Sequence, residues 1–138
     1  MTDQVLTGIR VLDLSQGMGG GYCTKLLADF GADVLKIEPP KIGDNLRTQA
    51  PFKNDSLSSD GAAFLYLNTN KKSITLDIFS DTGKDLFFRL LQDADVVVES
   101  FKPGTMEAAG LGFSDLEAAK PGVIMVAISY FGQNGPYA

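Results

Sequence analysis

"IRVLDLSQGMGGGYCTKLLADFGADVLKIE", residues 9–38, sets two apolar runs on either side of a glycine run and a segment with helical spacing. The apolar runs, residues 9–14 and 33–38, are rich in Val, Ile and Leu, as strands are. Between them, four apolar residues follow the spacing of one helix face: Cys23, Leu26, Leu27 and Phe30. Gly31 follows where a left-handed helix cap favours glycine. This order predicts two parallel strands joined by a crossover helix.

The rest of the chain continues this alternation of strand-like and helix-like segments. Three further strand-like runs are SITLDI (73–78), DVVVES (95–100) and VIMVAI (123–128). Asp81 is expected to cap a helix whose apolar face consists of Leu86, Phe87, Leu90, Leu91 and Ala94. Ser114 and Glu117 have the spacing of a capping box, in a short helix that Pro121 ends. We therefore predict an α/β fold, a Rossmann-like parallel sheet of about five strands with flanking helices.

Two segments differ from this pattern. In residues 73–78, apolar side chains alternate with polar ones, which places this strand near an edge of the sheet or near a ligand. Residues 40–61 are polar and lack periodicity, so we expect a long loop, which is usually functional or mobile. We expect residues 1–138 to form a single domain.

Composition narrows the function classes. The net charge of −5 disfavours binding to nucleic acid, which needs clustered lysine and arginine. No apolar run approaches the ~20 residues of a membrane-spanning helix, and no export signal is visible, so we expect a cytoplasmic protein with no membrane partner. The sequence has no histidine and one cysteine, which excludes Ser-His-Asp and Cys-His nucleophiles and histidine zinc sites. We expect no metal.

The glycine run lies where α/β proteins bind phosphate groups. A loop between a strand and a helix presents N–H groups and the positive end of the helix dipole to an anion. Gly17, Gly19 and Gly20 resemble the dinucleotide fingerprint G-x-G-x-x-G, and Glu38 lies where an acid binds the ribose of NAD. Tyr22, however, replaces the third glycine of the fingerprint. The residues alone leave two alternatives open: an NAD-type loop, or a glycine turn that lets the helix pack closely.

Four blocks of sequence resemble, in order, the N-terminal portion of the family III CoA-transferases, also called the CaiB/BaiF family. The blocks are GIRVLDLSQGMGGGYCTKLLADFGADVLKIEPP, FLYLNTNKKSITLDI, DADVVVESFKPGTMEAAGLGF and VAISYFGQNGPYA. The resemblance runs from Leu6 to the last residue. The family includes formyl-CoA and carnitine-CoA transferases and the related α-methylacyl-CoA racemases. The resemblance implies a Rossmann-like domain whose early strand-end loops hold coenzyme A.

The resemblance also implies which residues contact CoA. They are Met18, Gly19, Leu76, Ser100, Phe101 and Lys102. The first two fall in the glycine run, Leu76 lies beside the adenine and ribose, and the last three approach the nucleotide half. Considered by pattern alone, Leu76 is a half-buried strand leucine and Lys102 is a solvated turn lysine. Pro39 stands where some members carry an arginine that contacts the nucleotide.

Other residues have two interpretations each. Arg47, Lys71 and Lys72 are further candidates for phosphate contacts, since CoA is a polyanion. Cys23 lies near a helix N-terminus, where a thiol pKa falls, but it also begins the apolar face and has no histidine base. We interpret it as a packing residue. We interpret Asp13 as an anchor that accepts N–H groups near the glycine turn.

The resemblance implies a reaction whose nucleophile this sequence does not contain. In the family, an aspartate attacks an acyl-CoA thioester to give a mixed anhydride and then an aspartyl-CoA thioester. That aspartate lies a few tens of residues beyond the GPY block, and no catalytic residue is assigned here. We therefore expect the N-terminal CoA-binding portion of an acyl-CoA:carboxylate CoA-transferase, inactive by itself. Its substrates would be an acyl-CoA and a carboxylate acceptor, and the resemblance implies a homo-oligomer.

Three alternatives stay open at this point. The chain could be a truncated non-enzymatic module that self-associates through an uncovered sheet surface. It could belong to a relative of the acyl-CoA racemases. It could also be an NAD-dependent dehydrogenase domain, in which Glu38 would bind the ribose.

Overall fold

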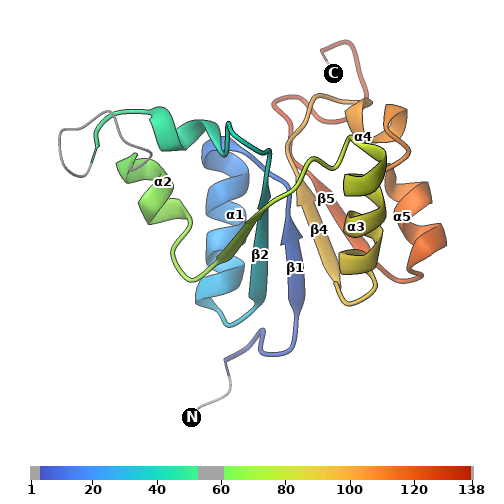
Figure 1. Cartoon of the computed structure of the whole chain (residues 1–138), viewed down its shortest axis with the longest axis horizontal. Coiled ribbons are helices and arrows are strands. Elements are labelled where there is room, and N and C mark those ends of the chain that lie inside the picture. The colour runs from blue at the N-terminus through green and yellow to red at the C-terminus, as the bar shows by residue number, and fades with distance from the viewer. Residues whose placement is uncertain (1–3, 53–60, 138) are drawn as a thin grey trace.

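The computed structural model describes residues 4–52 and 61–137, and its centre is a five-stranded sheet (Figure 1). The strands are β1 (Arg10–Asp13), β2 (Asp33–Glu38), β3 (Lys72–Thr75), β4 (Val96–Glu99) and β5 (Ile124–Ala127). Every pairing is parallel, and the strand order is β3-β2-β1-β4-β5. The predicted α/β fold, a Rossmann-like parallel sheet with about five strands, is confirmed.

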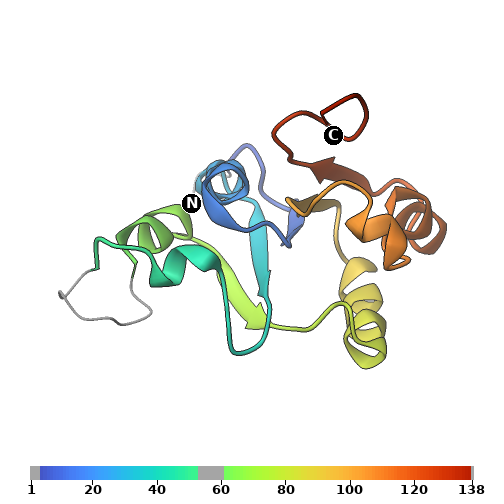
Figure 2. The same cartoon turned by 90° about the horizontal axis from the view of Figure 1, so that it is seen from above.

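Helices cover both faces of the sheet (Figure 2). They are α1 (Gly17–Asp29), the 3-10 helix η1 (Asn45–Thr48), α2 (Ala62–Leu67), α3 (Asp81–Leu91), α4 (Thr105–Ala108) and α5 (Phe113–Ala119). On one face, Val11, Val34 and Val98 pack against α1. On the other face lies the larger cluster, in which Phe87 and Leu91 of α3 are completely buried. The sheet is therefore the middle layer of three.

The strand order places a natural binding crevice between β1 and β4. From β1 the chain runs outward through β2 to β3, and it then returns to the other side of β1 as β4 and β5. The connections that leave the carboxyl ends of β1 and β4 therefore turn away from each other. In open α/β sheets, ligands bind in the crevice outside the strand ends at this topological switch point.

The structure corrects the predicted course of the glycine run and the predicted buried face of its helix. The glycines do not form a loop, because α1 begins at Gly17. Its buried residues are Gly20, Gly21, Thr24, Lys25 and Ala28. Leu26 and Phe30, which were predicted to face inward, are 38% and 57% exposed. The helix lies so close to the β1 end that a Cβ on Gly20 would be 2.2 Å from the Cβ of Ser15, which leaves room for bulky side chains only on the outer side.

Helix boundaries are confirmed in part. Gly31 has the expected left-handed conformation, with φ of 103°, directly after α1. The cap of α3 is Ser80, whose hydroxyl accepts from the N–H of Gly83, and Asp81 is the first helical residue. At α5 the N-cap is Gly112, which has no side chain, so the predicted capping box does not form; only its return contact is present, in which Asp115 accepts from the N–H of Gly112, two residues before the predicted pair.

The two unusual segments differ from their predictions in opposite ways: the strand is shorter, and the described part of the predicted loop contains secondary structure. β3 is an edge strand as expected, but it ends at Thr75, and Ile78 is buried in the turn that follows. In the predicted loop 40–61, residues 45–48 form η1, and Phe52 and Gly61 form an isolated antiparallel bridge. Residues 53–60 of that prediction lie outside the described residues.

Candidate functional site

A cleft of about 920 Å³ opens at the carboxyl edge of the sheet, at the switch point. Four segments line it: residues 16–20 at the start of α1, residues 45–49 around η1, residues 100–103 after β4, and residues 128–137 after β5. Because the first helical turn leaves its N–H groups without intrahelical partners, the start of α1 brings polar hydrogens and the positive helix end to this cleft. This arrangement is suited to an anionic ligand.

Five of the six residues that the resemblance implied lie at this cleft. They are Met18, Gly19, Ser100, Phe101 and Lys102. The sixth, Leu76, lines a smaller cavity of about 100 Å³, which shares Gln16 and Phe101 with the cleft. The fold thus brings together residues that are more than 80 positions apart in the sequence. Their role in binding stays a prediction.

Ser100 and Phe101 connect the loop after β4 to the rest of the site. The Ser100 hydroxyl accepts from the N–H of Gln16 at 2.8 Å and donates to the Gln16 carbonyl at 3.2 Å. The ring of Phe101 meets that of Phe79 edge to face, with centroids 5.5 Å apart. Lys102 is exposed, and it is the one charged side chain among the described residues that line the cleft.

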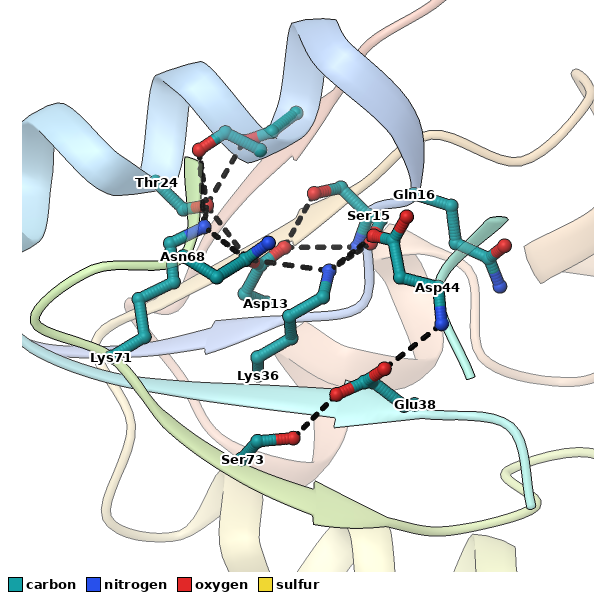
Figure 3. A network of polar contacts seen from close by, with 12 residues as sticks. Asp13, Ser15, Gln16, Thr24, Lys36, Glu38, Asp44, Asn68, Lys71 and Ser73 are labelled. Carbon is teal, nitrogen blue, oxygen red and sulfur yellow. Dashed lines mark hydrogen bonds and ion pairs between the residues drawn. The ribbon is translucent and has the colours of Figure 1, made fainter. Parts of the chain in front are cut away.

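Behind the cleft lies a group of charges that the sequence analysis did not predict, shown in Figure 3. We call Asp13, Lys36, Asp44 and Lys71 the buried charge network, because each of these side chains is at most 1% exposed. Its two carboxylates and two ammonium groups together carry no net charge. Buried ions are tolerated when they are paired and hydrogen-bonded in this way.

Asp13 anchors the start of α1, as the sequence analysis proposed. Its Oδ1 accepts from the N–H of Ser15 at 3.0 Å. Its Oδ2 accepts from the hydroxyl of Thr24 at 2.7 Å and from Nζ of Lys71 at 3.2 Å. The anchor therefore reaches further than predicted, to the middle of α1 and to the segment before β3.

Lys36 joins the start of α1 to the segment that leads into η1. Its Nζ lies 2.8 Å from Oδ2 of Asp44, 2.8 Å from the carbonyl oxygen of Ser15 and 3.9 Å from Oδ2 of Asp13. Oδ1 of Asp44 accepts from the N–H of Leu46 at 2.8 Å and from that of Gly17 at 3.4 Å. The ammonium group thus stabilises two walls of the cleft from behind.

Glu38 is already fully occupied by contacts within the chain. Its carboxylate accepts from Nε of Arg47 at 2.7 Å, from the hydroxyl of Ser73 at 2.6 Å and from the N–H of Asp44 at 2.8 Å. Burial alone would raise the pKa of Glu38, but these hydrogen bonds outweigh it and lower the pKa to about 2. The NAD alternative, which needs this carboxylate for a ribose, therefore loses its key residue.

The three further candidates for phosphate contacts, Arg47, Lys71 and Lys72, do not line the cleft. Arg47 pairs with Glu38 and stacks over the ring of Phe64, 3.8 Å from its centroid. Lys71 is held inside by Asp13, and burial lowers its pKa although Asp13 acts to raise it. Lys72 pairs with Asp33 at the opposite edge of the sheet, where β2 and β3 begin.

Cys23 has the properties of a packing residue. It is partly buried, and burial, together with the charge of Asp13, raises the pKa of its thiol above 9.0. A raised pKa keeps the sulfur protonated and therefore poorly nucleophilic. Among the described residues, no group of three or more His, Cys, Asp or Glu side chains is arranged to hold a metal ion. Within the same residues, no helix has the length and apolar character needed to span a membrane.

One signal in the sequence could have revealed the buried charge network. Val34, Lys36 and Glu38 alternate along β2, so all three side chains point to the α1 side of the sheet. A lysine on the buried face of an apolar strand requires a partner. The sequence could not show which residue that is, because Asp44 reaches it through the turn after β2.

Comparisons with known proteins agree with this geometry. The family model for CoA-transferase family III matches residues 6–138. A succinyl-CoA–D-citramalate CoA-transferase of Chloroflexus aurantiacus is 45% identical over 134 residues, which are 96% of this chain and 32% of that protein. A formyl-CoA:oxalate CoA-transferase of Bradyrhizobium diazoefficiens is 41% identical over 134 residues, covering 97% of this chain and 31% of its own length.

Solved structures give the same result. The crystal structure of a CAIB/BAIF family protein from Brucella suis superposes with a TM-score of 0.88 and 37% identity, over 99% of this chain and 36% of that one. A protein from Mycobacterium tuberculosis, in an orthorhombic crystal form, superposes with a TM-score of 0.88 and 38% identity, over 97% and 37%. The chain spans about a third of the length of these relatives. It belongs to CoA-transferase family III.

Proposed function

We propose that this chain is the N-terminal, CoA-binding portion of an acyl-CoA:carboxylate CoA-transferase. The observation that carries the proposal is the cleft at the switch point, where the start of α1 and the loop after β4 meet. Five of the six implied CoA contacts lie there, although they come from two segments far apart in the chain. The family match supports the same ligand class.

The chemistry of the cleft suits CoA. A volume of about 920 Å³ is large enough for an extended ligand of this kind. Phe101, Ile128 and Met18 offer apolar surface to the adenine and the pantetheine arm, while Lys102 and the amino end of α1 offer positive potential to the phosphates. We assign the small cavity between Leu76 and Phe101 to the adenine side of the ligand.

The described lining residues include no carboxylate, thiol or imidazole. We therefore assign this chain the tasks of binding and orienting CoA, and we assign the nucleophilic aspartate to the part of the protein outside these 138 residues. That carboxylate would attack the thioester carbonyl, form a mixed anhydride and release the CoA thiolate. The thiolate would then attack the aspartyl carbonyl, which gives the aspartyl-CoA thioester and releases the first acyl group as its carboxylate.

The substrates follow only as classes. The named relatives act on succinyl-CoA with D-citramalate and on formyl-CoA with oxalate. We carry over from them an acyl-CoA donor and a carboxylate acceptor.

Calorimetric titration with CoA tests the proposal. We expect saturable binding to the chain, and we expect Lys102→Ala to weaken it by roughly 2- to 5-fold, because an exposed charge contact contributes at most about 1 kcal/mol. Lys120→Ala is the matched control. Lys120 precedes β5, donates to the carbonyl of Gln92 and does not line the cleft. Absence of CoA binding in the unmodified chain, or equal losses in both variants, would contradict the proposal.

A further inference from the structure

Asp44 lies behind the cleft and contacts two of its walls. It is 1% exposed and does not line the cleft itself. Its Oδ1 accepts from the N–H of Leu46 in η1 and from the N–H of Gly17, the first residue of α1. Both residues line the cleft. One carboxylate oxygen therefore bridges two walls that come from different segments of the chain.

The other oxygen of Asp44 meets a cation that holds the same two walls. Nζ of Lys36 lies 2.8 Å from Asp44 Oδ2 and donates to the carbonyl of Ser15, directly before the cap of α1. Because this ammonium group is buried, it would lose its partner without gaining water if Asp44 moved away, which is energetically costly. The position of Asp44 is therefore fixed relative to the start of α1.

A second feature places η1 close to the start of α1. A Cβ built on Gly17 would lie 3.7 Å from Oδ1 of Asn45, so the first residue of η1 lies beside the first residue of α1. The N–H of Asp44 is also bound, by Glu38 at 2.8 Å. The segment that leads into η1 is therefore held from β2 by Lys36 and Glu38.

We infer that Asp44, held by Lys36, is a positioning residue of the cleft: it fixes the η1 wall against the first turn of α1 and thereby sets the affinity for CoA. The inference rests on the proposed function. Asp44 touches no reacting group and acts through Asn45, Leu46 and Gly17. Loss of its two acceptor bonds would let η1 move away from α1 and would widen the cleft at the end where the helix N–H groups are presented.

The test compares affinity with stability in four variants of the chain. Asp44→Asn keeps an acceptor for Leu46 but loses the pair with Lys36, and Asp44→Ala loses both. The double variant Lys36→Met/Asp44→Leu removes both charges, so that no unpaired ion is left inside. Asp29→Asn is the matched control, because Asp29 also accepts from a lysine at 2.7 Å and from Asn70, but at the far end of α1.

We expect the double variant to regain stability relative to Asp44→Ala while its CoA dissociation constant stays at least about tenfold above that of the unmodified chain. In both stability and affinity for CoA, Asp44→Asn is expected to lie between the unmodified chain and Asp44→Ala. Asp29→Asn is expected to lose stability and keep its affinity. An affinity that follows stability across all four variants, or an unchanged dissociation constant in Asp44→Ala, would overturn the inference.

Amide hydrogen exchange separates this inference from the proposed function. Without any ligand, the N–H of Leu46 should lose protection in Asp44→Ala and in the double variant, while the amides of β1 and β2 keep theirs. If the unmodified chain binds no CoA, the proposed function fails. The exchange protection of the Leu46 amide still shows whether Asp44 holds η1 in place. Retained protection of Leu46 in both variants would overturn the positioning role.

Discussion

Two acids at the carboxyl ends of β2 and β4, the strands on either side of β1, have opposite environments. Glu38 ends β2 and accepts from Arg47, Ser73 and a backbone N–H, and its pKa is about 2. Glu99 ends β4 and is 3% exposed. Burial and the charge of Glu107 raise the pKa of Glu99, although the N–H of Phe101 donates to it. The same residue type at the ends of two strands thus has its pKa lowered in one place by hydrogen bonds and raised in the other by burial.

Glu38→Gln is expected to destabilise the chain at pH 7 by about 1.5–3 kcal/mol, the contribution of hydrogen bonds to a charged group. The folded-state pKa of Glu38 is lowered from 4.5 to about 2, so its stabilising effect is complete above pH 4.5 and is lost as the pH falls toward 2. Urea unfolding between pH 7 and pH 3 checks this. The difference in unfolding free energy between the two chains should narrow below pH 4.5, and a constant difference would contradict the assignment.

Glu99→Gln is the paired experiment with the opposite sign. Because the folded-state pKa of Glu99 is raised above 4.5, the unmodified chain loses stability as the pH rises through that folded-state value. Glutamine stays neutral and keeps an acceptor for the N–H of Phe101. The variant should therefore gain stability relative to the unmodified chain on going from pH 4 to pH 8. A gain that is independent of pH would show that the carboxyl is not perturbed by burial.

At the scale of single elements, α1 departs most from what its sequence indicated. Its spacing predicted a helix correctly, and Gly31 ends it as expected. Periodicity identifies faces but does not tell which of them meets the sheet. Close approach at Gly20 decided that, and small residues turned inward while Leu26 and Phe30 remained outside. Such an approach depends on the distance between helix and strand, which no local pattern contains.

Gly20→Ala is expected to destabilise the chain by about 1–3 kcal/mol, as overpacking of a tight contact does. Its Cβ would meet the Cβ and Oγ of Ser15 at 2.2 Å, and Ser15 is itself hydrogen-bonded to Asp13. Gly19→Ala is the control one residue earlier, where the nearest atom, Cγ2 of Ile128, is 3.6 Å away. The control should be neutral or more stable because alanine favours helix. Thermal unfolding of both variants checks this, and equal effects would contradict the close packing of α1.

The elements and the site differ in how far the sequence predicted them. The strand-like runs located all five strands: continuous apolar runs mark buried parallel strands such as β4, and the alternating run marked β3, an exposed edge strand. The four-residue helix α4 was missed, because it is too short to show a period. The buried charge network was missed for another reason: Asp13 and Lys71 are 58 positions apart, and only the fold brings them together. The cleft residues were predicted from the family resemblance and not from periodicity.

At the scale of the molecule, the segment after β5 presents exposed aromatic side chains at the cleft. Tyr130 is 99% exposed, and Phe131 and Tyr137 are 69% and 77% exposed while their rings contact each other. Met18, which also lines the cleft, is 68% exposed. Apolar groups gathered on one side of a domain favour association. We therefore propose that the chain self-associates, in keeping with the homo-oligomer that the resemblance implies.

Sedimentation velocity over a hundredfold range of concentration tests self-association. The mass-average sedimentation coefficient should rise with concentration. The double variant Tyr130→Ser/Phe131→Ser should shift that rise to higher concentration, since it removes two exposed rings and leaves the buried core unchanged. A Leu65→Ser variant is the control, because Leu65 is 38% exposed on α2, outside the cleft wall. A monomer at every concentration would contradict the prediction.

The central claim, that the cleft between the start of α1 and the loop after β4 is built for CoA, is tested most directly by mapping the ligand on the amides of the chain. In a ¹H–¹⁵N titration with CoA, we predict saturating shifts for the amides of residues 17–20 and 100–102, and no comparable shifts with NADH. Shifts that gather away from these two segments, or an equal response to NADH, would contradict it.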